Sequence, residues 1–191
     1  DGGCQWMTAG SGIIHQEMPQ ACPRMLGFQL WLNLPRKDKW VRPQYRDLTA
    51  AKIPRVQEKT GAVGVISGAY GKARGATQGD YVKALLLDVN LKPDAAWRLP
   101  VDSAATVFIY IVDGAGGTGD PAARLERRRA VLFGEGDELA VQAGPEGMRF
   151  VLAAGRPLKE PIAWGGPIVM NTQEELDQAF AEIEAGTFVR P

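Results

Sequence analysis

The sequence predicts a mainly β protein that ends in one α-helix. The 191 residues include 23 glycines and 13 prolines, and turn formers at this frequency favour short strands joined by tight turns over long helices. Short apolar runs recur between the turn formers, and only the C-terminal segment has helical periodicity. Because 45% of the residues are hydrophobic, the chain can bury a sizeable core and general disorder is excluded.

The first 54 residues divide into strand-forming pieces and a polar connection. Residues 4–8, 12–18 and 27–34 are expected to be strands. In 27–34 (GFQLWLNL) an apolar residue occupies every second position, which is the period of a half-buried strand. Residues 35–54 are rich in charge and proline, so we expect a connecting segment over the surface.

A second set of strands follows, and glycine- or proline-bearing turns separate its members. Strands at this spacing indicate a β-sandwich or barrel. The expected strands are residues 62–67, 85–91, 106–112, 130–133, 138–142 and 148–153.

The last element is the helix, expected over residues 172–185. Thr172 and Glu175 have the spacing of a capping box, in which each side chain accepts a hydrogen bond from a backbone N–H of the first turn. Gly186 is a suitable stop. The apolar face consists of Leu176, Ala179, Phe180 and Ile183.

Charge and cysteine content exclude several classes of protein. Lys plus Arg and Asp plus Glu both number 22, which argues against binding to nucleic acid or anionic lipid through bulk charge. Cys4 and Cys22 are too few for a disulfide framework and form no Cys-x-x-Cys pair. The longest wholly apolar run, residues 107–112, is far shorter than a membrane helix. We therefore expect no membrane association and a reducing compartment, the cytoplasm or, in a eukaryote, also the nucleus.

The first candidate site is the pair His15 and Glu17. His15 is the only histidine in the chain. In a strand, residues i and i+2 point to the same face, so imidazole and carboxylate would project side by side and could ligate iron, manganese or zinc. The alternative is a hydrogen-bonded histidine beside a solvated glutamate, and it is favoured on spacing alone because two ligands rarely hold a catalytic metal.

The second candidate is the G-x-G-x-x-G sequence from Gly114 to Gly119, which follows an expected strand. Asp120 and Pro121 could open a helix, and Asp137 lies at the distance expected for the acidic residue of a dinucleotide site. The neighbouring segments, however, indicate strand after strand instead of alternating strands and helices. A hairpin loop is therefore the favoured interpretation.

Two weaker candidates remain. The arginine-rich stretch 124–129 could bind phosphate or protein, although a solvated loop face is the favoured alternative. A nucleophilic pairing of Cys4 or Cys22 with His15 is open, and neither Ser11 nor Ser67 lies in a nucleophile-elbow pattern.

Four longer motifs resemble those of the pirin family within the cupin superfamily. They lie in order along the chain and cover it from one end to the other. They are residues 5–19 (QWMTAGSGIIHQEMP), 27–35 (GFQLWLNLP), 156–162 (RPLKEPI) and 165–172 (GGPIVMNT).

The resemblance implies a bicupin in which each domain is a double-stranded β-helix of antiparallel strands. The expected domains are a remnant of the N-terminal cupin at 1–48, a linker at 49–61 and a C-terminal cupin at 62–191. The first strands of the N-terminal barrel are expected upstream of Asp1, so that barrel is incomplete in this chain.

The resemblance also implies a metal site inside the N-terminal barrel, usually with iron. Three histidines and one glutamate hold it in the family, two of the histidines coming from an earlier His-x-His motif. Carried over by position, His15 and Glu17 are the third and fourth ligands, and Glu17 is also the candidate base for a substrate proton. Some family members are quercetin 2,3-dioxygenases, which open a flavonol ring with O2 and release carbon monoxide, and others are described as metal-dependent transcriptional co-regulators.

This chain departs from the family pattern because it has no His-x-His. We therefore expect Fe(II) to bind weakly or not at all and any dioxygenase activity to be impaired. The expected partners are a flavonol-like aromatic substrate or a protein, without direct sequence-specific binding of nucleic acid. The alternative function is an iron-dependent redox sensor, a co-regulator or a protein-interaction scaffold.

Overall fold

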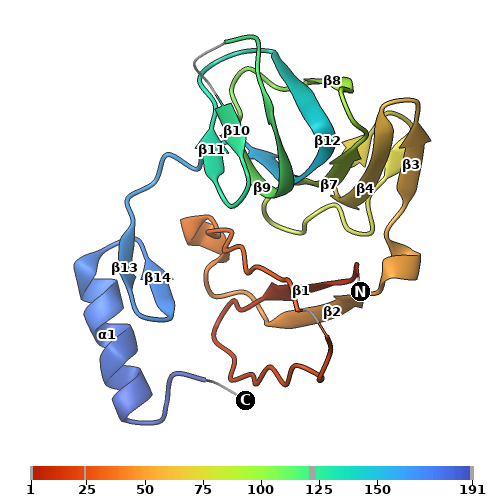
Figure 1. The fold of residues 1–191 in the computed structure, drawn as a ribbon. Helices are drawn as coiled ribbons and strands as arrows, with labels where there is room; N and C mark the ends of the chain where they lie inside the picture. Colours follow the sequence, from red (N-terminus) through yellow and green to blue (C-terminus); the bar gives the residue numbers. More distant parts are fainter. Residues whose placement is uncertain (1, 24, 121–123, 190–191) are drawn as a thin grey trace. The chain divides into compact units, whose positions relative to one another are not determined.

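The computed structural model describes residues 2–23, 25–120 and 124–189 (Figure 1). The chain forms two compact units, which are treated separately below. The larger unit comprises Asp1–Cys4 and Asp47–Pro157, and the smaller comprises Gln5–Arg46 and Leu158–Pro191. The domain boundaries expected above (1–48, 49–61 and 62–191) group the chain differently. They refer to family domains and stay a prediction.

The larger unit is built on an antiparallel eight-stranded sheet that forms a cupin-like β-sandwich (Figure 1). The main path along the sheet is β10-β9-β12-β7-β4-β3, while β11 pairs with β9 and β8 pairs with β12. Its strands are β3 (Arg55–Glu58), β4 (Gly61–Ser67), β7 (Leu85–Leu91), β8 (Ala96–Pro100), β9 (Thr106–Gly117), β10 (Arg124–Glu126), β11 (Ala130–Leu132) and β12 (Glu138–Gly155).

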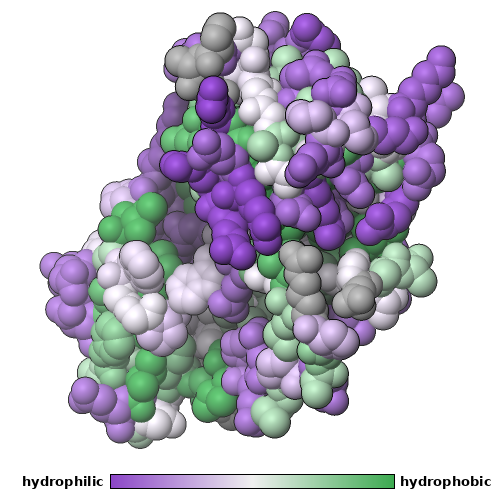
Figure 2. Space-filling view, in the orientation of Figure 1, coloured by the Kyte–Doolittle hydropathy of each residue, from purple (hydrophilic) through white to green (hydrophobic). Residues whose placement is uncertain are grey.

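Alternate residues of these strands build one apolar core. Val65, Leu87 and Phe150 come from three neighbouring strands and are fully buried, because side chains two residues apart share one face of a sheet. β12 is long enough to pair with β8 through its first part and with β7 through its second. Hydrophilic residues predominate on the visible outer face of this unit (Figure 2).

Shorter elements complete the chain. β1 (Cys4–Thr8) pairs with β2 (Gln44–Leu48), and β5 (Ala69–Tyr70) pairs with β6 (Ala73–Arg74). In the smaller unit β13 (Ala163–Gly165) pairs with β14 (Ile168–Met170). Two single 3₁₀ turns occur, η1 (Arg36–Asp38) and η2 (Ala50–Lys52).

The C-terminal helix α1 (Gln173–Glu184) confirms the predicted cap. The Oγ1 of Thr172 accepts from the N–H of Glu175, and the Glu175 carboxylate accepts from the N–H of Thr172. Gly186 follows with a φ of 69°, as expected for a helix stop. Leu176 and Ala179 are buried against the β13–β14 hairpin. No helix in the described ranges is long and apolar enough to cross a membrane.

The mainly β class and the single α-helix are confirmed, and several strand predictions hold closely. The expected strands 4–8 and 85–91 coincide with β1 and β7. The predicted break between 138–142 and 148–153 is wrong, because the glycines there accommodate a register irregularity inside one strand, β12, and not a turn.

The other errors lie in the first third of the chain. Residues 12–18 and 27–34 form no strand in the described ranges, since no other strand hydrogen-bonds to them. The expected connection over 35–54 contains β2, which pairs with β1. Residues 49–61 contain η2 and β3, and β3 extends the large sheet by pairing with β4; their expected role as a linker between family domains stays a prediction.

Candidate functional site

The segment that carries His15 and Glu17 begins at a glycine turn directly after β1. Gly10 and Gly12 have φ values of 51° and 113°, a region that side chains other than hydrogen rarely permit. The N–H of Gly12 donates to the carbonyl of Ala9 at 2.9 Å. Beyond this turn residues 13–23 have no regular secondary structure, and both predicted ligands are exposed.

The donor set of this chain does not complete a four-ligand metal site. Among residues 2–23, 25–120 and 124–189, no three His, Cys, Asp or Glu side chains gather where they could hold a metal ion. His15 and Glu17 supply one nitrogen and one carboxylate, whereas catalytic metal sites usually take three protein ligands. Two donors on an exposed irregular segment therefore do not fit an iron centre by themselves.

The two cysteines lie in different environments. Cys4 is partly buried in β1, and this burial raises the pKa of its thiol. The reactive thiolate is therefore disfavoured at neutral pH. Cys22 is exposed on the irregular segment.

The glycine-rich sequence 114–119 belongs to a β-hairpin. β9 continues to Gly117 and pairs with β10, which confirms the hairpin interpretation. A Cβ at Gly116 would lie 2.2 Å from the carbonyl oxygen of Gln142, so glycine permits close approach of β9 to β12. The helix start considered at Pro121 lies outside the described residues.

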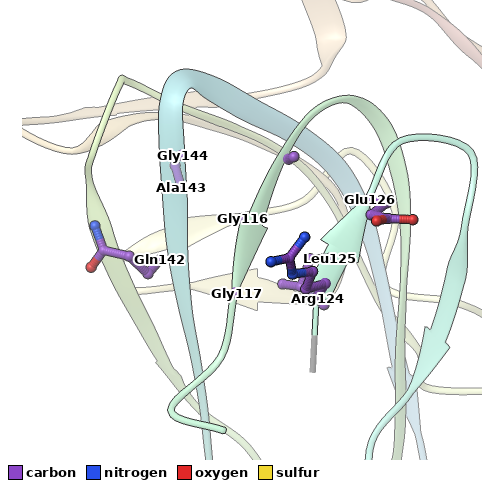
Figure 3. Close-up of a pocket in the computed structure, with 9 residues that line it drawn as sticks. Gly116, Gly117, Arg124, Leu125, Glu126, Gln142, Ala143 and Gly144 are labelled. Atoms are coloured by element: carbon purple, nitrogen blue, oxygen red, sulfur yellow. The ribbon is translucent and has the colours of Figure 1, made fainter. Parts of the chain in front are cut away.

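A shallow depression of about 380 Å³ lies over the same strands, lined by residues 115–117, 124–126 and 142–144 (Figure 3). Gln142 and Glu126 point away from each other at its two sides (Figure 3). The Nε2 of Gln142 donates to the carbonyl of Asp94, and Glu126 accepts from Arg129. Since neighbours already engage these two groups, the depression defines no catalytic cluster.

The arginine-rich stretch is also largely engaged by its own surroundings. Arg127 pairs with Asp113 at 3.4 Å, and Arg129 pairs with Glu126 at 3.0 Å. These pairs favour the interpretation of a solvated face over a dedicated phosphate site.

A polar cluster in the smaller unit was not predicted. Lys39 is only 8% exposed, and its Nζ donates to Oδ1 of Asn33 at 2.7 Å and to the carbonyl of Val169 at 3.0 Å. Burial lowers the pKa of Lys39, while Glu160 and Glu175 oppose that shift. The sequence does contain basic residues at 36–39 and acidic residues in the C-terminal part of the chain. These segments lie far apart in the sequence, so the sequence alone does not reveal that they are in contact.

A second unpredicted network lies in the larger unit. The hydroxyl of Tyr70 donates to Glu58 at 2.7 Å and accepts from Nε1 of Trp97 at 3.0 Å. The Trp97 ring stacks on Tyr70 and meets Phe150 edge-on. Burial, reinforced by the hydrogen bond to Glu58, raises the pKa of Tyr70 to about 12. The network satisfies polar atoms at the border of the core, and its one carboxylate, Glu58, belongs to no group of three metal-ligating side chains among the described residues.

The antiparallel sandwich and its strand order define a cupin-type protein. The sequence profile of the Pirin C-terminal cupin domain matches residues 86–189, and the Pirin profile matches residues 1–32. The chain belongs to the pirin family.

Individual relatives agree with this assignment. Human pirin is 40% identical over 186 residues, which cover 95% of this chain and 63% of that protein. A pirin-like protein of Caulobacter vibrioides is 40% identical over 192 residues, covering 98% of this chain and 68% of that protein. The crystal structure of quercetin 2,3-dioxygenase from Acinetobacter baumannii is similar, with a TM-score of 0.82 and 29% identity over 98% of this chain and 67% of that one. The chain thus spans less than two thirds of the length of human pirin.

Proposed function

We propose that this chain is part of a pirin-type cupin that cleaves flavonols as a quercetin 2,3-dioxygenase. The observation that carries the proposal is the His15-x-Glu17 motif, placed in a chain whose fold resembles a quercetin 2,3-dioxygenase over almost its whole length. In this proposal His15 and Glu17 are two ligands of an Fe(II) site, and Glu17 also accepts the proton of the flavonol hydroxyl.

We further propose that the 191-residue chain alone is impaired. Its only histidine is His15, and the described residues contain no third donor near the pair. Two ligands leave a divalent ion mostly hydrated, so the ion exchanges easily with solvent. Substoichiometric iron and background oxygen consumption are the expected properties of this chain.

A chimera tests the proposal. The segment of the Caulobacter pirin-like protein that precedes its match to this chain is fused in front of Asp1, to supply the His-x-His expected from the family. We expect the chimera to bind one iron per chain and to consume O2 with quercetin while releasing carbon monoxide. His15→Ala and Glu17→Gln in the chimera should each abolish turnover, whereas the exposed control Gln20→Ala should retain it.

Two results would contradict the proposal in different ways. Tight one-to-one iron binding by the 191-residue chain would show that it is not impaired. An iron-loaded, folded chimera that leaves quercetin intact would remove the dioxygenase assignment.

The second result would favour the alternative, an iron-dependent sensor or interaction protein. One observation supports that alternative independently. Ile14, Met18 and Met25 are 60–90% exposed on the irregular segment, and exposed bulky apolar side chains are typical of surfaces that contact another protein. A pull-down in which binding depends on the oxidation state of the loaded iron would distinguish this function from catalysis.

A further inference from the structure

The glycine turn in front of His15 lies directly against Val41. The N–H of Ser11 donates to the Val41 carbonyl at 2.9 Å. A Cβ at Gly10 would lie only 2.0 Å from the same oxygen, so a side chain at this position would force the two segments apart. The start of the His15–Glu17 segment is thereby fixed to residue 41 of the same unit.

The ring of Phe188 closes the other side of this turn. A Cβ at Gly12 would lie 2.7 Å from Cε1 of Phe188, which means that the ring occupies the place of a side chain at position 12. The Phe188 ring also contacts Trp40, with 6.4 Å between ring centroids. Its backbone N–H donates to the carbonyl of Glu182 at 3.2 Å, so the end of α1 sets the position of the ring.

Polar contacts tie the same regions together a second time. Arg36 donates from its guanidinium to Glu175 and from its backbone N–H to Glu160, both at 2.8 Å. Buried Lys39 donates to the carbonyl of Val169. Loss of either acceptor would leave the buried ammonium of Lys39 short of hydrogen-bond partners, which costs free energy. These contacts therefore hold residues 36–41 against the C-terminal tail, defined here as residues 158–189.

We propose that Phe188 is a positioning residue for His15 and Glu17, acting through Gly12 at the point where the ligand segment leaves the fold. The proposal rests on the proposed function, in which these two side chains are metal ligands. His15 is three residues beyond Gly12, at most about 10 Å of extended chain, so the placement of the turn limits where the imidazole can lie. Supporting contacts matter because a misplacement of about 1 Å in a functional group can cost about a hundredfold in activity.

Hydrogen exchange of the 191-residue chain tests the proposal without a metal. Phe188→Ala removes the ring, and we expect exchange of the hydrogen-bonded amides of Ser11 and Gly12 to accelerate about tenfold through easier local opening. The imidazole signals of His15, the only histidine, should sharpen in the NMR spectrum as the segment gains mobility. Phe188→Leu keeps an apolar side chain against Gly12 and should restore most of the protection.

Matched variants separate positioning from general destabilisation. Gly12→Ala pushes on the ring from the other side and should reproduce Phe188→Ala. Gly71→Ala is its control, because Gly71 also has a positive φ, 55°, and a Cβ there meets nothing within 4 Å. Trp164→Ala is the control for loss of an aromatic ring from the tail. Unchanged exchange at Ser11 and Gly12 in Phe188→Ala, or an equal acceleration in β7 and β12, would overturn the proposal.

The chimera distinguishes this inference from the proposed function. If Phe188→Ala weakens iron binding of the chimera and Phe188→Leu restores it, both stand. If the folded chimera shows no turnover but Phe188→Ala still accelerates exchange at Ser11 and Gly12, the dioxygenase assignment fails and the positioning role stands. Full turnover and unchanged iron affinity in Phe188→Ala would overturn the positioning role alone.

Discussion

Two segments with the same alternating pattern have opposite fates in this protein. β7 and residues 27–34 both place apolar side chains at every second position. β7 lies between β4 and β12, and its Leu87 and Val89 are fully buried. Residues 27–34 belong to no sheet in the described part of the chain, and Phe28 is 52% exposed. Alternation therefore specifies a half-buried strand only where neighbouring strands supply the hydrogen bonds and the apolar cover.

Charged side chains show the same contrast. Asp88 on β7 is mostly buried and accepts two hydrogen bonds from Arg149, at 2.9 and 3.0 Å. Glu17, on the irregular segment, is exposed. The carboxylate of Asp88 on the large sheet has a structural role that its neighbours define, whereas the role of Glu17 depends on groups that the described residues do not bring near it.

The largest difference in the free energy of unfolding is expected when a phenylalanine is replaced by alanine in each of the two regions. Phe150→Ala empties a fully buried site in the sandwich and should lower the free energy of unfolding by about 3–5 kcal/mol. Phe28→Ala removes the same ring from an exposed place and should change it by no more than about 0.5 kcal/mol. Urea denaturation followed by tryptophan fluorescence measures both variants.

A loss of more than about 2 kcal/mol for Phe28→Ala would contradict the contrast between β7 and residues 27–34. It would show that residues 27–34 pack in solution as β7 does. A small loss for Phe150→Ala would instead show that the sandwich refills the cavity.

Tyr70→Phe tests how much the hydrogen-bonded network of Tyr70, Glu58 and Trp97 stabilises the larger unit. Removing the hydroxyl leaves Nε1 of Trp97 without its acceptor and Glu58 without one donor. The expected loss of stability is about 1–3 kcal/mol. Because the folded pKa of Tyr70 is raised to about 12 from an ordinary value of 10.0, its contribution is complete below pH 10 and is lost as the pH rises toward 12.

Absorbance at 295 nm provides the measurement. The wild-type chain contains four tyrosines, and one of them should ionise late in the titration. Tyr70→Phe should remove this late phase. Persistence of the late phase in Tyr70→Phe would refute the assignment.

The features that the sequence could predict also differ from those that depend on distant contacts. β7 and the capping box at Thr172 could be predicted because local pattern and final environment agree. β8 and the network of Tyr70 were missed, since short strands and side-chain partners depend on contacts between distant residues. At the candidate site the resemblance predicts His15 and Glu17, and this stays a prediction. The contact of Phe188 with Gly12 joins residues 176 positions apart, and no local pattern reveals it.

A smaller loss of stability is expected when the N-terminal cap of helix α1 is removed. Thr172→Ala removes the acceptor for the N–H of Glu175 and should cost about 1 kcal/mol. The backbone N–H of Asn171, followed by that of Thr172 and by Arg36, holds the pKa of Glu175 below its ordinary value of 4.5. Its stabilising contribution is therefore present above pH 4.5 and is lost as the pH falls below it.

Thermal unfolding followed by circular dichroism between pH 7 and pH 3 checks both statements. Glu175→Gln should flatten the acid side of the stability profile, whereas Gln178→Ala on the same helix should not. An unchanged acid limb in Glu175→Gln would show that the cap does not couple to the fold in solution.

The smallest effect on stability is expected at the candidate ligands themselves. His15→Ala and Glu17→Ala should each change the free energy of unfolding by no more than about 0.5 kcal/mol, since both side chains are exposed. Equal stability of these variants and the wild-type chain by urea denaturation is the predicted result. A larger loss would mean that the pair already has structural partners within this chain, and the comparison with Asp88 and Arg149 would then fail. If stability is unchanged here while turnover in the chimera is abolished, the two residues are present for chemistry and not for folding, because the sandwich holds together without them.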